Sequence, residues 1–292
     1  MCSEIVPTIP LLSNRQLLSG LAFVVAWSNA HAAESSPYSL LPADEKEHSG
    51  WSFYIDNDRL SLTESDYGYT AGFALARSGR ATIDAPLSLH RPLLKLSRLT
   101  EWVSEQSTDP RYHYHSISYG MAAFTPENIQ TTTPILSDRP YACLAYTAST
   151  QQTVIPTDQT AFLNTLSLGL LGTGLCKHMQ NLVHDLANGI AANGWNNQIS
   201  HGIEPTVLWR LGRQRLLHSE TSRTRHEVSW NADAQFGWAT DAGLGISWRW
   251  GLIRSPWWSF TPQQSEYAPI ADAPMSHYRN QAAFQKGEEL YI

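Results

Sequence analysis

The stretch EVSWNADAQFGW, residues 227–238, alternates between apolar and polar side chains along its whole length. Its apolar positions are Val228, Trp230, Ala232, Ala234, Phe236 and Trp238. The next stretch, DAGLGISWRW at residues 241–250, repeats the pattern. Because a period of two residues places alternate side chains on opposite faces of a β-strand, both stretches are predicted strands with one apolar and one polar face.

The same alternation recurs over most of the chain and predicts an all-β, antiparallel fold. It is clear over residues 67–77, and weaker segments lie at 51–56, 111–121, 141–154, 161–171 and 203–213. A soluble periplasmic sandwich would turn the apolar faces into a core, whereas a transmembrane β-barrel would turn them toward lipid and keep a polar lumen. The polar faces carry Glu, Asp, Asn and Arg, which favours the barrel over the sandwich.

Composition narrows the class of protein further. Charged residues make up 16% of the 292-residue chain and aromatic residues 11%, a balance opposite to that of disordered proteins. The formal net charge of -6 offers no basic face for a nucleic-acid partner, and we expect none. After residue 30 the chain has no apolar run long enough for a transmembrane helix, which needs about 18 residues.

The N-terminus has the pattern of an export signal. Arg15 precedes a short apolar stretch at residues 17–27, and Ala30-His31-Ala32 supplies the small residues of a cleavage site. We therefore expect a signal peptide over residues 1–32 and an outer-membrane β-barrel domain over residues 33–292. Two cysteines remain after cleavage, Cys143 and Cys176, and a single bridge between them is left open.

One segment has helical rather than strand periodicity. Apolar residues recur between positions 174 and 188, at Leu175, Met179, Leu182, Val183 and Leu186, which predicts a short extracellular helix. Gln180 and His184 are four residues apart and share the face away from this stripe. Either this face is functional or it is a solvated face with an incidental histidine.

Two long connections, residues 78–110 and 252–286, are rich in Pro, Ser and charge and are expected to be extracellular loops. The first of them contains a predicted short helix from Lys95 to Val103.

Common catalytic motifs are absent from the sequence. There is no G-x-S-x-G elbow, no H-E-x-x-H or paired C-x-x-C, and no glycine-rich phosphate loop. Oxygen-bearing side chains do gather at the end of the first predicted strand, in Asp56-Asn57-Asp58. Such ligands suit Ca²⁺, although Asp and Asn clusters also form ordinary turns.

Six short motifs, in this order, resemble the LpxR-like lipid A 3'-O-deacylases, which are outer-membrane enzymes of Gram-negative bacteria. The motifs are Asp56-Asn57-Asp58, Tyr69-Thr70-Ala71-Gly72, Phe124-Thr125-Pro126-Glu127, Asp138-Arg139-Pro140-Tyr141-Ala142, Gln180-Asn181-Leu182-Val183-His184 and Gly194-Trp195-Asn196-Asn197-Gln198. Glu204 follows the last of them, and the resemblance runs from about residue 50 to 251.

The resemblance implies a twelve-stranded barrel with its active site between the wall and an extracellular helix. It further implies Ca²⁺-dependent hydrolysis that removes the 3'-linked acyloxyacyl chain of lipid A in lipopolysaccharide. Carried over to this chain, His184 is the general base, with Gln180 beside it. Asn57 and Asp58 hold Ca²⁺, and Thr70 lines the same pocket. Imidazole and a bound cation suit ester hydrolysis without a covalent nucleophile.

This chain departs from the family pattern at two places. The stretch before Pro134 is Thr131-Thr132-Thr133, where the best-known member of the family has lysines, and Arg139 is the candidate substrate-binding substitute. An acidic residue expected about two turns after the histidine is replaced by Asn188-Gly189-Ile190.

Two other hypotheses about the function remain open. One is an outer-membrane phospholipase A, which needs a serine nucleophile beside a histidine; Ser229 and Ser247, on the polar faces of their strands, cannot be assigned that way. The other is a non-catalytic porin or adhesin. The expected state is a monomer among outer-membrane lipids. Eight strands are counted to Gly251, and Glu288–Ile292 looks like the start of a ninth. A single-chain barrel must close, so a truncated chain is expected.

Overall fold

The computed structural model of the chain describes residues 40–57, 71–98, 110–186, 191–200, 203–221, 225–253, 255–262, 274–275, 278–280 and 290–291. The predicted signal peptide, residues 1–32, therefore lies outside the described part, and its cleavage stays a prediction. No helix in this part is long and apolar enough to cross a membrane.

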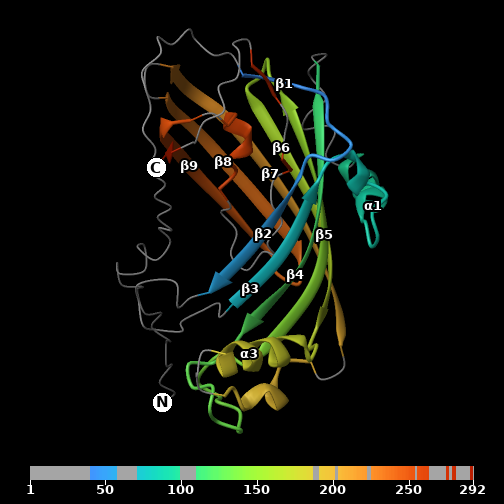
Figure 1. Ribbon diagram of the computed structural model, residues 1–292, viewed down its shortest axis with the longest axis vertical. Helices are drawn as coiled ribbons and strands as arrows, with labels where there is room; N and C mark the ends of the chain where they lie inside the picture. Colours follow the sequence, from blue (N-terminus) through green and yellow to red (C-terminus); the bar gives the residue numbers. More distant parts are fainter. Residues whose placement is uncertain are drawn as a thin grey trace, which may run out of the picture.

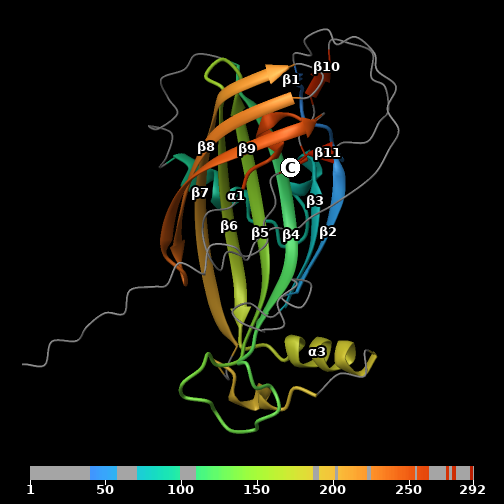
Figure 2. The ribbon, with the colours of Figure 1, turned by 90° about the vertical axis from the view of Figure 1, so that its left-hand side faces the viewer.

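Eight strands follow one another in an antiparallel meander, which confirms the predicted all-β fold. They are β2 (Gly50–Asn57), β3 (Ala71–Ser78), β4 (Tyr112–Phe124), β5 (Ala142–Ile155), β6 (Thr160–Leu171), β7 (Glu204–Thr221), β8 (Arg225–Gly237) and β9 (Asp241–Leu252). Each pairs with its neighbours in sequence, and the sheet curls into a barrel wall (Figures 1 and 2).

Two further short pairings complete the described sheets. β11 (Leu290–Tyr291) adds to the edge of β9, which confirms the ninth strand predicted at the end of the chain. β1 (Leu40–Pro42) pairs with β10 (Tyr278–Asn280) in a separate two-stranded sheet. Within the described part, β2 and β11 are the outer strands of the larger sheet, and the expected truncation stays a prediction.

The polar faces of the last strands lie on the concave, buried side of the wall. On β8 the buried residues are Glu227, Ser229, Asn231, Asp233 and Gln235. Their charges are paired: Arg249 donates to Glu227, with an Nε–Oε2 distance of 2.9 Å, and Arg210 lies 3.4 Å from Asp233. The 3-10 helix η5 (Trp257–Ser259) packs on this side, where Gln152 donates to the Trp258 carbonyl at 2.6 Å.

The apolar faces lie on the convex side and are exposed. Leu244 on β9 is 81% exposed and Ile246 is 77% exposed, while Trp51, Phe53 and Ile55 on β2 are exposed as well. In a water-soluble sandwich these side chains would fill a core. A polar, ion-paired interior with an apolar exterior is the arrangement of a barrel whose wall contacts lipid, which agrees with the predicted orientation of the strands.

One helix covers part of the convex face. α1 (His90–Ser97) buries Leu93 against Leu166, and the Leu89 backbone N–H donates to the Ser149 hydroxyl at 2.8 Å (Figure 1). The predicted helix from Lys95 to Val103 thus begins earlier, at His90, and its second half lies outside the described residues.

The two long connections begin at the end of the barrel opposite the second helix, α3 (Leu175–Leu186), because β3 ends there at Ser78 and β9 ends there at Leu252. Residues 79–111 follow the end of β3, whereas α3 follows the end of β6. Three antiparallel strands separate the two positions, and an odd number of strands returns the chain to the other end. The prediction that residues 78–110, residues 252–286 and the helix are all extracellular is therefore wrong.

Candidate active site

The meander brings the candidate site residues to one end of the barrel. β2 ends at Asn57, the segment with Arg139 joins β4 to β5, and α3 carries Gln180 and His184 between β6 and β7. All three connections leave the strands at the same end of the barrel, where α3 lies across the strand ends (Figure 2). Asp58 and Thr70 belong to the connection between β2 and β3 but lie outside the described residues.

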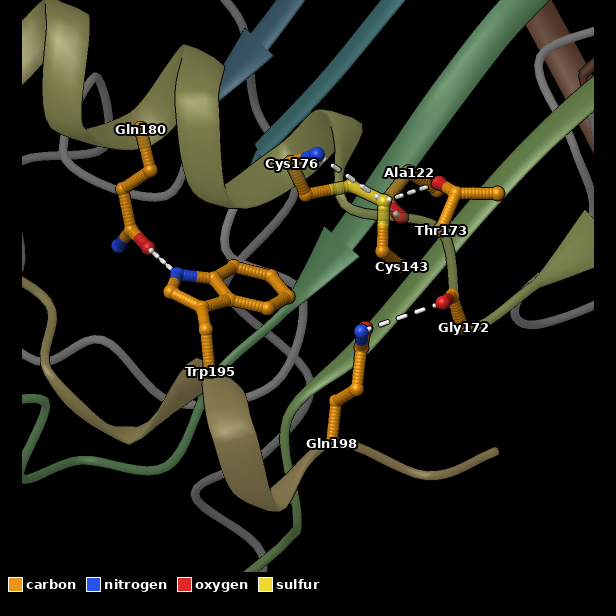
Figure 3. The surroundings of a disulfide bond; sticks show 8 residues. All are labelled: Ala122, Cys143, Gly172, Thr173, Cys176, Gln180, Trp195 and Gln198. Carbon is orange, nitrogen blue, oxygen red and sulfur yellow. Dashed lines mark hydrogen bonds between the residues drawn. A yellow bond between two sulfur atoms is a disulfide. The ribbon is translucent and has the colours of Figure 1, made fainter. Parts of the chain in front are cut away.

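A disulfide fastens the first turn of α3 to the barrel. Cys143 on β5 and Cys176 are bridged, with their Cα atoms 5.6 Å apart, and both side chains are buried (Figure 3). The sequence left open whether these two cysteines are paired, and the structure shows that they are. The Cys143 sulfur also lies 3.1 Å from the Thr173 hydroxyl, in the turn that leads into the helix.

A second attachment holds the next turn of α3. Trp195 lies on the 3-10 helix η4 (Gly194–Asn197), and its indole N–H donates to Gln180 Oε1 at 2.7 Å (Figure 3). Asn181 Oδ1 accepts a hydrogen bond from the Ala192 backbone N–H at 3.3 Å. The polar face of α3 is thus bonded to the segment that follows it.

Trp195 is itself fixed by the segment between β4 and β5. Its ring lies 4.8 Å from that of Tyr141, whose hydroxyl donates to the Ile129 carbonyl at 2.9 Å. Burial raises the pKa of Tyr141, so the phenol stays protonated as a donor. Gly194 is required here, because a Cβ atom would lie 2.3 Å from the Tyr141 ring.

These residues form one small core at the end of the barrel, here called the end cluster. It contains Ala123, Ile129, Tyr141, Cys143, Cys176, Ala192 and Trp195. Neither the disulfide nor the role of Trp195 was predicted from the sequence. The pair of cysteines in an exported chain was the sequence signal for the disulfide, and Trp195 belongs to the motif Gly194-Trp195-Asn196-Asn197-Gln198, which by itself indicates no role for the indole.

The orientation of α3 bears on whether its polar face is functional. Gln180 and His184 are half-buried on the side of the helix that faces the protein, whereas Leu175, Met179 and Leu182 of the apolar stripe are exposed. A merely solvated polar face would show the reverse arrangement. The helix therefore holds the imidazole and the amide toward the barrel end and its apolar stripe away from it.

Arg139 lies in the same end of the molecule, two residues before Tyr141. Its side chain is 4.0 Å from the Asp138 carboxylate, which also accepts hydrogen bonds from the backbone N–H groups of Arg139 and Glu127, both at 2.7 Å. Asp138 thus closes the turn in which Arg139 stands. The side chain of Arg139 is 24% exposed, so it is accessible from solvent.

The predicted calcium ligands are only partly described. Asn57 pairs with Ala71 across β2 and β3, and its backbone marks where β2 ends. Among the residues that the structure describes, no group of three His, Cys, Asp or Glu side chains is placed to hold a metal ion.

The serines considered for a phospholipase lie inside the barrel wall, away from α3. Ser247 accepts a hydrogen bond from the Asn231 amide at 3.0 Å, and its hydroxyl reaches the Ser229 carbonyl at 3.5 Å. These bonds tie the two serines to the ladder between β8 and β9.

A solved structure and a family model match this chain. No curated protein matches the chain. A solved structure, LpxR from Salmonella typhimurium, aligns with a TM-score of 0.47 and 13% sequence identity, over 62% of this chain and 52% of that one. The aligned part thus spans about half the length of that protein.

A family model described as outer membrane protein LpxR matches residues 17–285, a range that takes in β2 to β9 and α3. Since that match extends over most of the chain, from before the first strand to beyond the last long one, the chain belongs to the LpxR family of outer-membrane proteins.

Proposed function

We propose that this protein is a Ca²⁺-dependent outer-membrane esterase that removes the 3'-linked acyloxyacyl chain of lipid A. The orientation of α3 carries the proposal: Gln180 and His184 face the protein, at the barrel end where β2 delivers Asn57. Membership of the LpxR family supports the outer membrane as its location and lipopolysaccharide as its substrate.

The proposed chemistry needs one proton acceptor and a source of positive charge. His184 takes a proton from a water molecule, whose oxygen then attacks the ester carbonyl carbon. When the bond between that carbon and the ester oxygen breaks, the protonated imidazole gives the proton to the leaving alkoxide, and an imidazole suits both roles near neutral pH. Gln180, one helical turn earlier, offers amide N–H donors on the same face. No covalent nucleophile is required, so the serines inside the wall have no part in the reaction.

Asn57 and Asp58 would hold the Ca²⁺ ion, with Thr70 beside them. Asp58 directly follows Asn57 in the chain, and Thr70 directly precedes Ala71, the partner of Asn57 on β3. Amide and carboxylate oxygens are the ligands that Ca²⁺ prefers. When bound, the ion supplies positive charge that stabilises the oxyanion formed on the carbonyl oxygen.

The substrate would approach from the lipid around the barrel. The exposed stripe of α3 (Leu175, Met179 and Leu182) suits a helix that rests at a membrane surface with its apolar side toward acyl chains. Arg139, which is partly accessible, would bind a phosphate group of lipid A. The protein is proposed to act on this substrate as a monomer.

The test is mass spectrometry of lipid A after incubation with the refolded protein, with Ca²⁺ and with a chelator. Loss of one acyloxyacyl unit is expected only when Ca²⁺ is present. His184→Ala should lower the rate by about 100-fold or more, as expected for loss of a general base.

His178→Ala is the matched control, because His178 is an exposed histidine on the same helix. It should retain the activity of the unmodified protein. Equal activity of the His184→Ala variant, or unchanged lipid A in every condition, would contradict the proposed function.

A further inference from the structure

The hydrogen bond between Trp195 and Gln180 determines which way the Gln180 amide faces. An indole N–H can only donate, and in a glutamine amide only the oxygen can accept. The 2.7 Å contact therefore requires Oε1 on the Trp195 side. The nitrogen, Nε2, points away from the indole ring (Figure 3).

The indole itself has little freedom to change this arrangement. Trp195 is 2% exposed and packs in the end cluster against Tyr141. The backbone on either side is held as well, since the Asn193 N–H donates to the Ile129 carbonyl at 2.9 Å and the Ile199 N–H to the Tyr141 carbonyl at 2.7 Å.

The disulfide between Cys143 and Cys176 anchors α3 one turn before Gln180. Donor and acceptor are thus both attached to the same small core, and the amide is oriented before any substrate arrives.

We infer that Trp195 is a positioning residue, which keeps the two N–H donors of Gln180 turned toward the ester carbonyl oxygen of the substrate. The inference rests on the proposed function. An amide free to flip would present its oxygen to the developing oxyanion for part of the time, and a like partial charge there opposes the reaction. A preorganised donor stabilises that charge without reorganisation during the reaction.

Four variants test the inference in the full chain, refolded in detergent with Ca²⁺. Trp195→Phe removes the indole N–H and keeps a buried aromatic ring. Gln180→Glu keeps an acceptor for Trp195 but has no donors, and Gln180→Ala removes both. Trp209→Phe is the matched control, because the Trp209 indole donates a similar bond of 2.8 Å to Asn164 on the barrel wall.

We expect Trp195→Phe to lower kcat about twofold with KM unchanged, since an amide that flips freely between two orientations loses about half of its productive population. Gln180→Glu and Gln180→Ala should each lower kcat about 100-fold, as for loss of an oxyanion donor. Trp209→Phe should leave kcat unchanged.

The decisive measurement is the double variant Trp195→Phe/Gln180→Ala. If Trp195 acts through Gln180, the Phe substitution has no further effect in the Ala background. A purely structural tryptophan would instead lower kcat by the same factor in both backgrounds, or would raise KM along with it, and either result overturns the inference.

The same experiment separates this inference from the proposed function. Full activity in His184→Ala and in both Gln180 variants would refute the proposed function, and the inference with it. Inactive His184→Ala and Gln180 variants, beside a fully active Trp195→Phe, would refute only the role of Trp195. Heat-modifiable migration of each variant on a gel reports whether its barrel has folded.

Discussion

Replacing Ile246 by arginine tests whether the convex face of the wall contacts lipid. Ile246 stands in the middle of β9, and 77% of it is exposed. If this face met water, the substitution would change the free energy of unfolding by no more than about 0.5 kcal/mol, as at other exposed positions. If it meets the centre of a bilayer, the cost is about 2–4 kcal/mol. Because about 1.4 kcal/mol is a tenfold change, the folding equilibrium constant should fall by a factor of about 30 to 700.

The assay is urea unfolding of the protein in phospholipid vesicles, followed by tryptophan fluorescence. Leu136→Arg is the control, since Leu136 is 99% exposed but lies in the segment between β4 and β5, beyond the strand ends. It should unfold like the unmodified protein, and Ile246→Leu should do so as well. An Ile246→Arg variant as stable as the Leu136→Arg variant would refute the assignment of the convex face to lipid.

Three further outcomes follow from the structure. Gly194→Ala should displace η4 and lower the deacylation rate about tenfold or more, measured by mass spectrometry of lipid A, because the new Cβ would lie 2.3 Å from Tyr141. Reducing the Cys143–Cys176 bridge should speed hydrogen exchange in α3, while the barrel still migrates on a gel as a folded band because the bridge lies outside the strand ladder. Unchanged exchange would show that the packing of the end cluster holds α3 in place without the disulfide bond. Burial, together with the neighbouring His115, lowers the pKa of His90 from 6.5 to about 4, so the neutral form is favoured when α1 is packed. The stabilisation of packed α1 by neutral His90 is complete above pH 6.5 and is lost as the pH falls toward 4, and it amounts to at most about 3 kcal/mol. Hydrogen exchange, corrected for the intrinsic rate, should therefore show α1 opening near pH 5 in the unmodified protein. The His90→Phe variant should show no such pH dependence.

The strands could be predicted because the polarity of each side chain indicates on which face of the sheet it lies. In β9 the predicted segment 241–250 and the observed Asp241–Leu252 differ by two residues, and every predicted apolar position in it proved to be on the convex side. Membrane strands need no long-range information to be recognised, since one face meets lipid and the other a polar interior throughout their length.

The placement of the connections could have been predicted as well, because it follows from strand parity. Between the segment after Ser78 and the helix at Leu175 the sequence already showed three strands, so the two had to lie at opposite ends. Composition misled here: a long segment rich in Pro and Ser looks like an extracellular loop at either end of a barrel.

The end cluster could not be predicted in the same way. Its members come from β4, β5, α3, η4 and the segments that join them, and no periodicity relates Trp195 to Gln180, 15 positions earlier. The contact depends on how three connections pack together, which is set by shape rather than by a repeating pattern. The sequence pointed to Gln180 and His184 as a pair, whereas the way in which they are oriented required the structure.

The exposed stripe of α3 bears on how the proposed enzyme would meet its substrate. Leu175, Met179 and Leu182 would be expected to pack inward if α3 were an ordinary helix over a polar barrel end. They face outward instead, as do Leu168 and Leu170 near the end of β6, the strand that leads into the helix. Exposed apolar side chains thus lie both on the wall near the end of β6 and on α3, while the polar face of the helix is half-buried. The proposed enzyme would need such apolar side chains beside its site, because the acyl chains of its substrate stay in the membrane, whereas a water-filled porin would not need them.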